Sequence, residues 1–148
     1  MKNFKEFMIQ DHRDCDSVFS DAEKLVESGD WSGAKEAFLV FKKDMLTHFG
    51  MEEEIIFPEF NQKSGGGCNP TGVMLMEHDQ MKRLLGILES KIDAQDKDSF
   101  FGSSDTLMMV LQQHNLKEEQ IMYNLALDAL SGEQGEILQR VQAYKSGK

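Results

Sequence analysis

Proline and cysteine are scarce in this chain, and each scarcity narrows the range of folds. Only two prolines, Pro58 and Pro70, occur among 148 residues, so long stretches lack the residue that most often ends a helix. Glycine is grouped at 65–67 instead of being spread along the chain, as it is in many all-β folds. The only cysteines, Cys15 and Cys68, are too few for a disulfide framework or a cysteine-rich zinc site, and they favour a reduced compartment.

Positive charge and long apolar runs are also in short supply. Sixteen Lys and Arg stand against 26 Asp and Glu, and the net charge of -10 argues against nucleic acid and anionic membranes as partners. A membrane-spanning helix needs about 18 consecutive apolar residues, and the sequence has no such run. Residues 1–6 lack the apolar core of a signal peptide. We therefore expect a cytoplasmic protein, and residues 1–148 are long enough for one domain with one core.

Apolar residues recur at alternating steps of three and four in four segments, which is typical of helices that pack in a bundle. The expected inward positions are Met8, His12, Cys15, Phe19, Ala22 and Val26; Ala34, Phe38, Phe41, Met45, His48, Glu52 and Ile55; Met74, His78, Met81, Leu85, Leu88 and Ile92; and Leu107, Leu111, His114, Glu118, Ile121 and Leu125. Turn-forming residues separate the segments at 28–30, 58–72 and 96–105, with Phe100 and Phe101 at the start of the fourth.

Short connections between consecutive helices indicate antiparallel neighbours. The sequence therefore predicts an all-α, up-down-up-down four-helix bundle over about 4–130. The remaining extension, 131–148, is consistent with a short fifth helix at 133–144.

The two halves of the chain repeat each other. His12 precedes His78 by 66 residues, and His48 precedes His114 by the same number. The second pair lies in matching text, because each of these histidines begins a His-x-x-x-Glu-Glu string. If a pseudo-two-fold axis relates the halves, the four histidines converge as two symmetric pairs.

Every histidine of the chain falls on an inward stripe, one per segment. Residues four apart share a helix face, with Cβ atoms about 5–6 Å apart, so each His-x-x-x-Glu pair can reach one site. Buried carboxylates and imidazoles are costly unless something compensates them, and a pair of divalent cations does so. This donor set suits iron or another first-row metal, manganese included. The predicted metal ligands are His12, His48, Glu52, His78, His114 and Glu118.

The string at 48–58, His-Phe-Gly-Met-Glu-Glu-Glu-Ile-Ile-Phe-Pro, resembles the hemerythrin-like (HHE cation-binding) domain family, and the resemblance extends over nearly the whole chain. It implies a four-helix bundle that holds two iron ions with a bridging oxo or hydroxo group. Carried over, His12 and His48 would bind one iron. His78 and His114 would bind the other, and Glu52 and Glu118 would bridge both.

The sequence departs from the oxygen-carrier pattern at two points. Lys82 stands four residues after His78, where the carriers have a fifth histidine. On the last helix the carriers place an aspartate five residues after the histidine, whereas here Glu118 and Glu119 occupy the fourth and fifth positions. Glu118 stays on the stripe, and a helical bulge would instead favour Glu119. With a fifth histidine missing, the resemblance implies an open position on each iron and redox chemistry in place of reversible oxygen carriage.

Four neighbouring residues allow both a functional and a structural interpretation. Lys82 either reaches the second metal or lies along the bundle edge with its charge in water. Cys15 is either close to the metals or a small core residue. Glu53 and Glu119 are either solvated or orient a ligand histidine through its second nitrogen.

Three classes of function follow. The first is a metal protein that binds or reacts with dioxygen, peroxide or nitric oxide, with an electron donor that is not identified. The second, which the resemblance also implies, is a stress protein that handles iron or repairs iron–sulfur clusters. The third is a metal-free structural bundle whose polar core sets its register.

Overall fold

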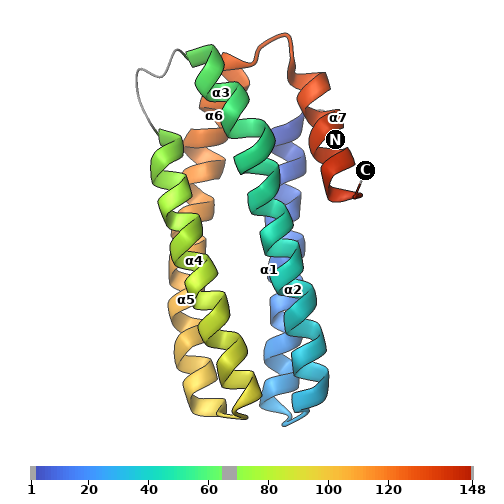
Figure 1. The fold of residues 1–148 in the computed structure, drawn as a ribbon, viewed down its shortest axis with the longest axis vertical. Coiled ribbons are helices and arrows are strands. Elements are labelled where there is room, and N and C mark those ends of the chain that lie inside the picture. The colour runs from blue at the N-terminus through green and yellow to red at the C-terminus, as the bar shows by residue number, and fades with distance from the viewer. Residues whose placement is uncertain (1–2, 65–69, 148) are drawn as a thin grey trace.

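A computed structural model describes residues 3–64 and 70–147, and these are helical almost throughout (Figure 1). The α-helices are α1 (Phe4–Glu27), α2 (Trp31–Met51), α3 (Phe57–Ser64), α4 (Pro70–Asp93), α5 (Lys97–Lys117), α6 (Tyr123–Ala129) and α7 (Gln134–Lys145). Two π-helical turns join them, η1 (Glu52–Ile56) between α2 and α3 and η2 (Glu118–Met122) between α5 and α6. Since no strand occurs in the described ranges, the all-α prediction is confirmed. Cys68 lies outside these ranges.

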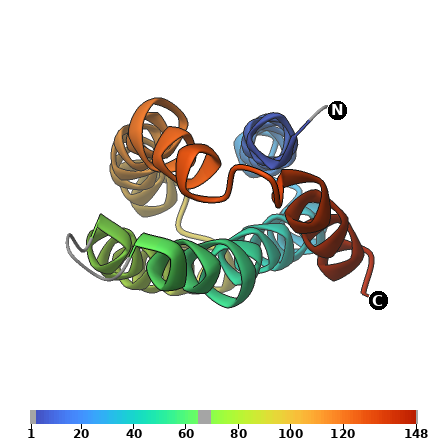
Figure 2. The same ribbon diagram turned by 90° about the horizontal axis from the view of Figure 1, so that it is seen from above.

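The long helices α1, α2, α4 and α5 lie side by side (Figure 1). α1 contacts α2 and α4 contacts α5, while α2 also contacts α4 and α1 also contacts α5. Figure 2 shows α7 outside this group, next to α1 and α2. The predicted fifth helix at 133–144 is therefore present as α7. None of the helices in the described ranges combines the length and apolar character that a bilayer crossing requires.

The turns between α1 and α2 and between α4 and α5 have the same construction. Each ends a helix with a residue at positive φ, Gly29 at 80° and Gln95 at 53°. Each then begins the next helix with an aspartate cap, since the side chain of Asp30 accepts from the Gly33 N–H and that of Asp96 from the Ser99 N–H. The internal repeat thus extends from the histidines to the turns.

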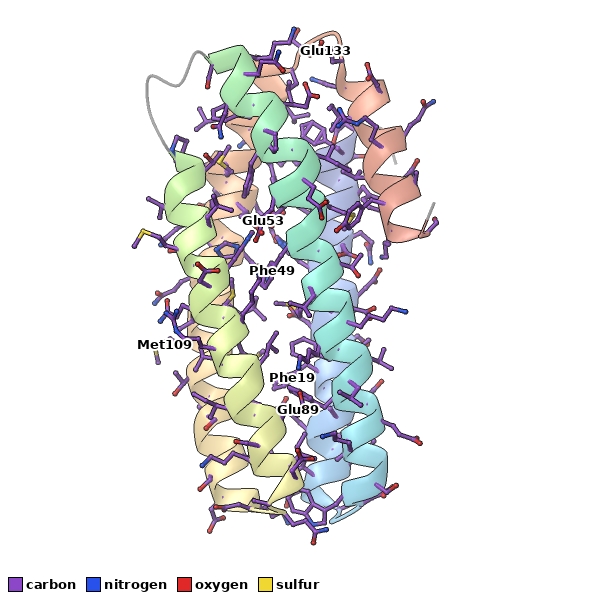
Figure 3. The ribbon with its side chains drawn as sticks, in the orientation of Figure 1. Phe19, Phe49, Glu53, Glu89, Met109 and Glu133 are labelled. Atoms are coloured by element: carbon purple, nitrogen blue, oxygen red, sulfur yellow. The ribbon has the colours of Figure 1, made fainter. Side chains whose placement is uncertain are left out.

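Two apolar clusters fill the interior and leave a polar layer between them. The lower core, toward the two turns, contains Phe19, Phe38, Phe41, Phe49 and Phe100. The upper core, under α3, α6 and α7, contains Phe4, Met8, Met51, Ile56, Phe57 and Tyr123. Figure 3 shows Phe19 in the lower part of the bundle and Phe49 and Glu53 near mid-height.

The π turns change the register of the helices above the polar layer. In η1 the Phe57 N–H donates to the Glu52 carbonyl, and in η2 the Tyr123 N–H donates to the Glu118 carbonyl, five residues back in each case. The extra residue per turn rotates everything that follows.

One sequence prediction fails for this reason. Ile121 and Leu125 are predicted to point inward but are 56% and 42% exposed, while Met122 and Ala126 are buried in their place. The connection predicted at 58–72 is also too long. Pro58 lies in the first turn of α3, where proline is tolerated, so the helix runs on to Ser64, and α4 begins at Pro70.

Candidate metal centre

The structure brings all six predicted ligand residues into the polar layer between the two cores. Their side chains are buried: His12, His48, Glu52, His78, His114 and Glu118. The histidines form the two expected pairs, with ring centroids 4.5 Å apart for His12 and His48 and 5.0 Å apart for His78 and His114. We call the first pair with its surroundings the first half of the centre and the second pair the second half.

The two glutamates lie between the halves and face both. Glu118 Oε1 is 2.9 Å from His12 Nε2, and Glu118 Oε2 is 3.1 Å from His114 Nε2. Glu52 Oε1 is 3.1 Å from His78 Nε2 and 3.6 Å from His48 Nε2. Glu118 thus directs one oxygen at each half, as a bridging ligand between two cations needs, whereas Glu52 presents the single oxygen Oε1 to both halves.

Each of the four histidines has a carboxylate at its outer nitrogen. The distances from Nδ1 are 2.7 Å for His12 to Glu119, 2.8 Å for His48 to Asp11, 2.7 Å for His78 to Glu53, and 2.7 Å for His114 to Glu77. An ionised carboxylate can only accept a hydrogen bond, so each Nδ1 carries a proton and donates it. Nε2 of each ring is thereby directed inward as the nitrogen that can bind a metal.

The carboxylates also keep the histidines protonated when no cation is bound. Burial alone would lower the pKa of His78, but hydrogen bonds and negative charge from Glu118 and Glu52 raise it to about 10. Burial is likewise outweighed at His48, where the charge of Glu52 and the hydrogen bond to Asp11 raise the pKa well above its usual range. A cation that binds here takes the place of these protons.

Four buried polar atoms in the centre make no well-oriented hydrogen bond in the described part of the chain: Glu52 Oε1, His78 Nε2, His114 Nε2 and Glu118 Oε2. They face one another as ion pairs, since Glu52 Oε1 lies 3.1 Å from His78 Nε2 and Glu118 Oε2 lies 3.1 Å from His114 Nε2. All four belong to residues of the second half or to the shared glutamates, and one donor atom from each lies within 4.8 Å of the others. Buried polar groups without such a bond are rare because each is costly. Donor atoms of this chemistry that converge without well-oriented hydrogen bonds fit a bound metal ion.

A second such group consists of His12, His48 and Glu118, all buried. The residues therefore fit the two metal ions that the sequence indicated, with Glu118 common to both groups. The geometry could hold the ions, and the ligand roles themselves stay a prediction.

Tyr123 is a residue of the centre that the sequence interpretation missed. Its hydroxyl oxygen lies 2.7 Å from Glu52 Oε2 and 3.0 Å from Glu118 Oε1. The same oxygen is 3.3 Å from His12 Nε2 and 3.4 Å from His48 Nε2. Burial, followed by the negative charge of Glu118 and Glu52, raises the pKa of the phenol well above its usual range. On an α-helical register position 123 falls off the inward stripe, so only the π turn could have identified it.

Asp11 and Glu77 were missed as well, although the repeat contains a signal for them. Each directly precedes a ligand histidine, 66 residues apart, yet each serves the histidine of the neighbouring helix. Asp11 also accepts from Lys145 of α7, whereas Glu77 accepts from Lys117.

The open interpretations of the neighbouring residues are now answered. Glu53 and Glu119 orient histidines and are not solvated bystanders. Lys82 is 39% exposed, and its Nζ lies 3.7 Å from Glu53, at the edge of the bundle and not over the second half. Cys15 is a buried member of the lower core, and burial raises the pKa of its thiol to about 12.

The fold and the site together define a class of protein: an all-α domain with a buried His/Glu cluster able to hold metal. The hemerythrin HHE cation-binding domain matches residues 3–126, and the chain belongs to that family. A protein of Nostoc sp. (strain PCC 7120) named DNA nickase is 27% identical over 146 residues. That match covers 99% of this chain but 39% of the relative, so the chain spans well under half of that protein's length. No solved structure matches the chain.

Proposed function

We propose that this chain is a non-haem di-iron protein that binds or reacts with dioxygen, peroxide or nitric oxide at a four-histidine, two-glutamate centre. The observation that carries the proposal is the set of four buried donor atoms that face one another without a well-oriented hydrogen bond in the described residues. The proposal takes the long helices as an up-down-up-down bundle and residues 1–148 as one hemerythrin-like domain.

In this proposal His12 and His48 hold one iron, His78 and His114 hold the other, and Glu52 and Glu118 bridge them. Bound iron would supply a redox-active, Lewis-acidic centre. The chain's own contribution is orientation: four outer carboxylates hold the imidazole rings and keep each Nε2 unprotonated when a cation is present. The two apolar cores exclude water from above and below.

We assign the approach of a small ligand to an apolar hollow of about 180 Å³. It lies where α4 meets α5 and η2, and its lining includes Met74, Met122 and Ile121. Met74 stands one turn before His78, and Met122 stands four residues after Glu118, so the hollow adjoins the second half. Its apolar lining suits a diatomic molecule or peroxide better than a larger charged substrate.

A metal-free structural bundle is the weaker alternative. A polar core that only sets register gains nothing from donor atoms without well-oriented hydrogen bonds, whereas such atoms are costly. The name of the Nostoc relative raises nucleic acid as a second class of partner. We assign no nucleic acid to this chain, because its net charge of -10 repels phosphate.

The test is to load the protein with ferrous iron without air, count iron per chain, and then add dioxygen while the visible spectrum is recorded. We expect about two irons per chain and conversion to an oxidised spectrum, with peroxide and nitric oxide tried next. Iron that instead passes to an acceptor protein would favour the iron-handling alternative.

Glu52→Gln and Glu54→Gln form a matched pair, since both residues belong to η1 but Glu54 is exposed and bonds to Tyr144. Only the Glu52 variant should lose iron. An absence of stoichiometric iron in the unmodified protein would reject the proposal.

A further inference from the structure

The hydroxyl of Tyr123 occupies a position in the first half that has no counterpart in the second. We propose that Tyr123 is a further protein ligand, a phenolate that binds the iron held by His12 and His48. This inference rests on the proposed di-iron function. It adds that the two irons differ in the number of side chains that hold them.

The spacing of donor atoms supports coordination. Atoms bound about 2.1 Å from a first-row metal in adjacent positions lie about 3 Å apart. The Tyr123 oxygen lies 2.7 Å and 3.0 Å from the nearest oxygens of Glu52 and Glu118, which are the proposed bridges. It lies 3.3 Å and 3.4 Å from the inward nitrogens of His12 and His48. The hydroxyl oxygen thus lies 2.7–3.4 Å from these donors, while Glu118 Oε1 lies 2.9 Å from His12 Nε2 and 3.8 Å from His48 Nε2.

The hydroxyl of Tyr123 is surrounded by the proposed ligands. Its side chain is fully buried, and in the described residues all four of its hydrogen-bond partners are proposed metal ligands. The η2 turn places it there, because the five-residue bond to the Glu118 carbonyl rotates position 123 onto the inward face.

The repeat supplies a natural comparison. Position 57 corresponds to 123, and there the chain has Phe57, whose ring centroid lies 6.0 Å from that of His78. Phenylalanine offers no donor atom, so among the described residues the candidate ligands of the second half are two histidines and two shared carboxylates. The first iron is then held by five side chains and the second by four. We infer that the external small molecule binds the second iron, on the side where the apolar hollow lies.

The proton balance of the step is simple. The phenol proton is the one directed at Glu52 in the metal-free protein. When ferric iron binds, the oxygen–iron bond forms, the O–H bond breaks, and the proton leaves to the buffer, with no change of oxidation state.

The test is visible and resonance Raman spectroscopy of the protein loaded with ferric iron. We expect a phenolate-to-iron charge-transfer band and enhanced tyrosinate ring vibrations. Tyr123→Phe should lose both while it still binds iron. The chain has only one other tyrosine, so Tyr144→Phe is the matched control and should keep the full signal. The double variant Phe57→Tyr/Tyr123→Phe should recover the vibrations, now from the second half.

Each outcome separates this inference from the proposed function. About two irons per chain without tyrosinate vibrations would overturn the ligand role of Tyr123 and leave the di-iron proposal intact. A band that persists in Tyr123→Phe would do the same. Failure of the unmodified protein to bind iron would overturn both.

Discussion

The two halves of the centre offer the same kinds of predicted ligand but differ in what surrounds them. In the first half, Tyr123 fills the space between the donors and α7 covers the outer face. In the second half, Phe57 replaces the phenol, the inward nitrogens of both histidines make no well-oriented hydrogen bond in the described residues, and an apolar hollow lies outside. The histidines, the outer carboxylates and the π turns follow the 66-residue repeat. The Tyr123 hydroxyl and the cover of α7 have no equivalent in that repeat, and both lie in the first half. The comparison indicates that the metal position of the first half is closed to an external ligand and that the position of the second half is open.

A second pair of positions related by the 66-residue repeat shows that α7 covers the first half only. Gly50 of α2 lies under the ring of Tyr144, and the corresponding residue in α5 is Leu116, which is 54% exposed. Lys145 of α7 bonds to Asp11, while Lys117 provides the equivalent contact to Glu77 from within α5. The first half therefore depends on the C-terminal helix and the second does not.

Removal of a carboxylate shared by both halves should weaken iron binding in both at once. It should have the largest effect of the variants considered. Glu118→Gln takes a donor from both halves, so we expect the iron content to fall from about two to below one per chain. Without metal, the variant should lose about 3–5 kcal/mol in the free energy of unfolding, because His12 and His114 lose their buried counter-charge. Iron counting and urea unfolding measure the two effects.

Glu119→Gln is the control for that variant, since Glu119 contacts only the outer nitrogen of His12 among the ligands. It should retain most of the iron. Full iron content in Glu118→Gln would contradict the bridging role.

The pH dependence of the unfolding free energy of the metal-free protein should show how much protonation of His78 stabilises the fold. The pKa of His78 is about 10 in the folded protein against about 6.5 when unfolded. A raised pKa contributes stability that is fully present below the unfolded value and is lost as pH rises through the folded value. We therefore expect the free energy of unfolding to fall between pH 7 and 10.

The iron-loaded protein is the comparison for the pH series, because its histidines are already unprotonated at Nε2. Its stability should change much less over the same range. Equal slopes with and without iron would show that the histidines are not the source of the effect.

Substitution of an outer carboxylate should weaken iron binding in only one of the two halves. Loss of a group that orients a metal ligand costs about 10–100-fold in affinity. Glu77→Ala should weaken iron binding in the second half, and Asp11→Ala should weaken it in the first. Competition with a chelator would resolve the two irons. Asp14→Ala, which removes an exposed carboxylate bonded to Gln10, should change neither.

The smallest effect should come from the α7 contact. A Cβ at position 50 would lie 2.1 Å from the Tyr144 hydroxyl oxygen, so Gly50→Ala forces that ring and the end of α7 to move. We expect a loss of about 1 kcal/mol in the free energy of unfolding. Leu116→Ala at the exposed equivalent should stay within about 0.5 kcal/mol. Thermal unfolding of the two variants measures both losses. A larger loss in Leu116→Ala than in Gly50→Ala would contradict the packing of α7 on α2.

The sequence was sufficient for the helices, for the polar layer and for which six predicted ligand side chains gather in it, because histidine spacing and the repeat carry that information directly. It was insufficient for Tyr123, Ile121 and Leu125, since a constant helical period cannot show where one extra residue enters a turn. Asp11 and Glu77 required knowledge of which helices are neighbours, because each carboxylate serves a histidine on another helix.

The π turns have a consequence for the tolerance of the chain to insertions and deletions. Each turn begins at one of the two glutamates that we propose as bridges, and each holds one residue more than an α-helical turn would. Deletion of a single residue from η2 would permit an ordinary helix, yet it would carry Tyr123 away from the centre and turn the upper-core residues Met122 and Ala126 toward solvent. The length of these two turns is thus fixed more strictly than the identity of most residues in them, and a one-residue deletion there should be more damaging than any conservative substitution nearby.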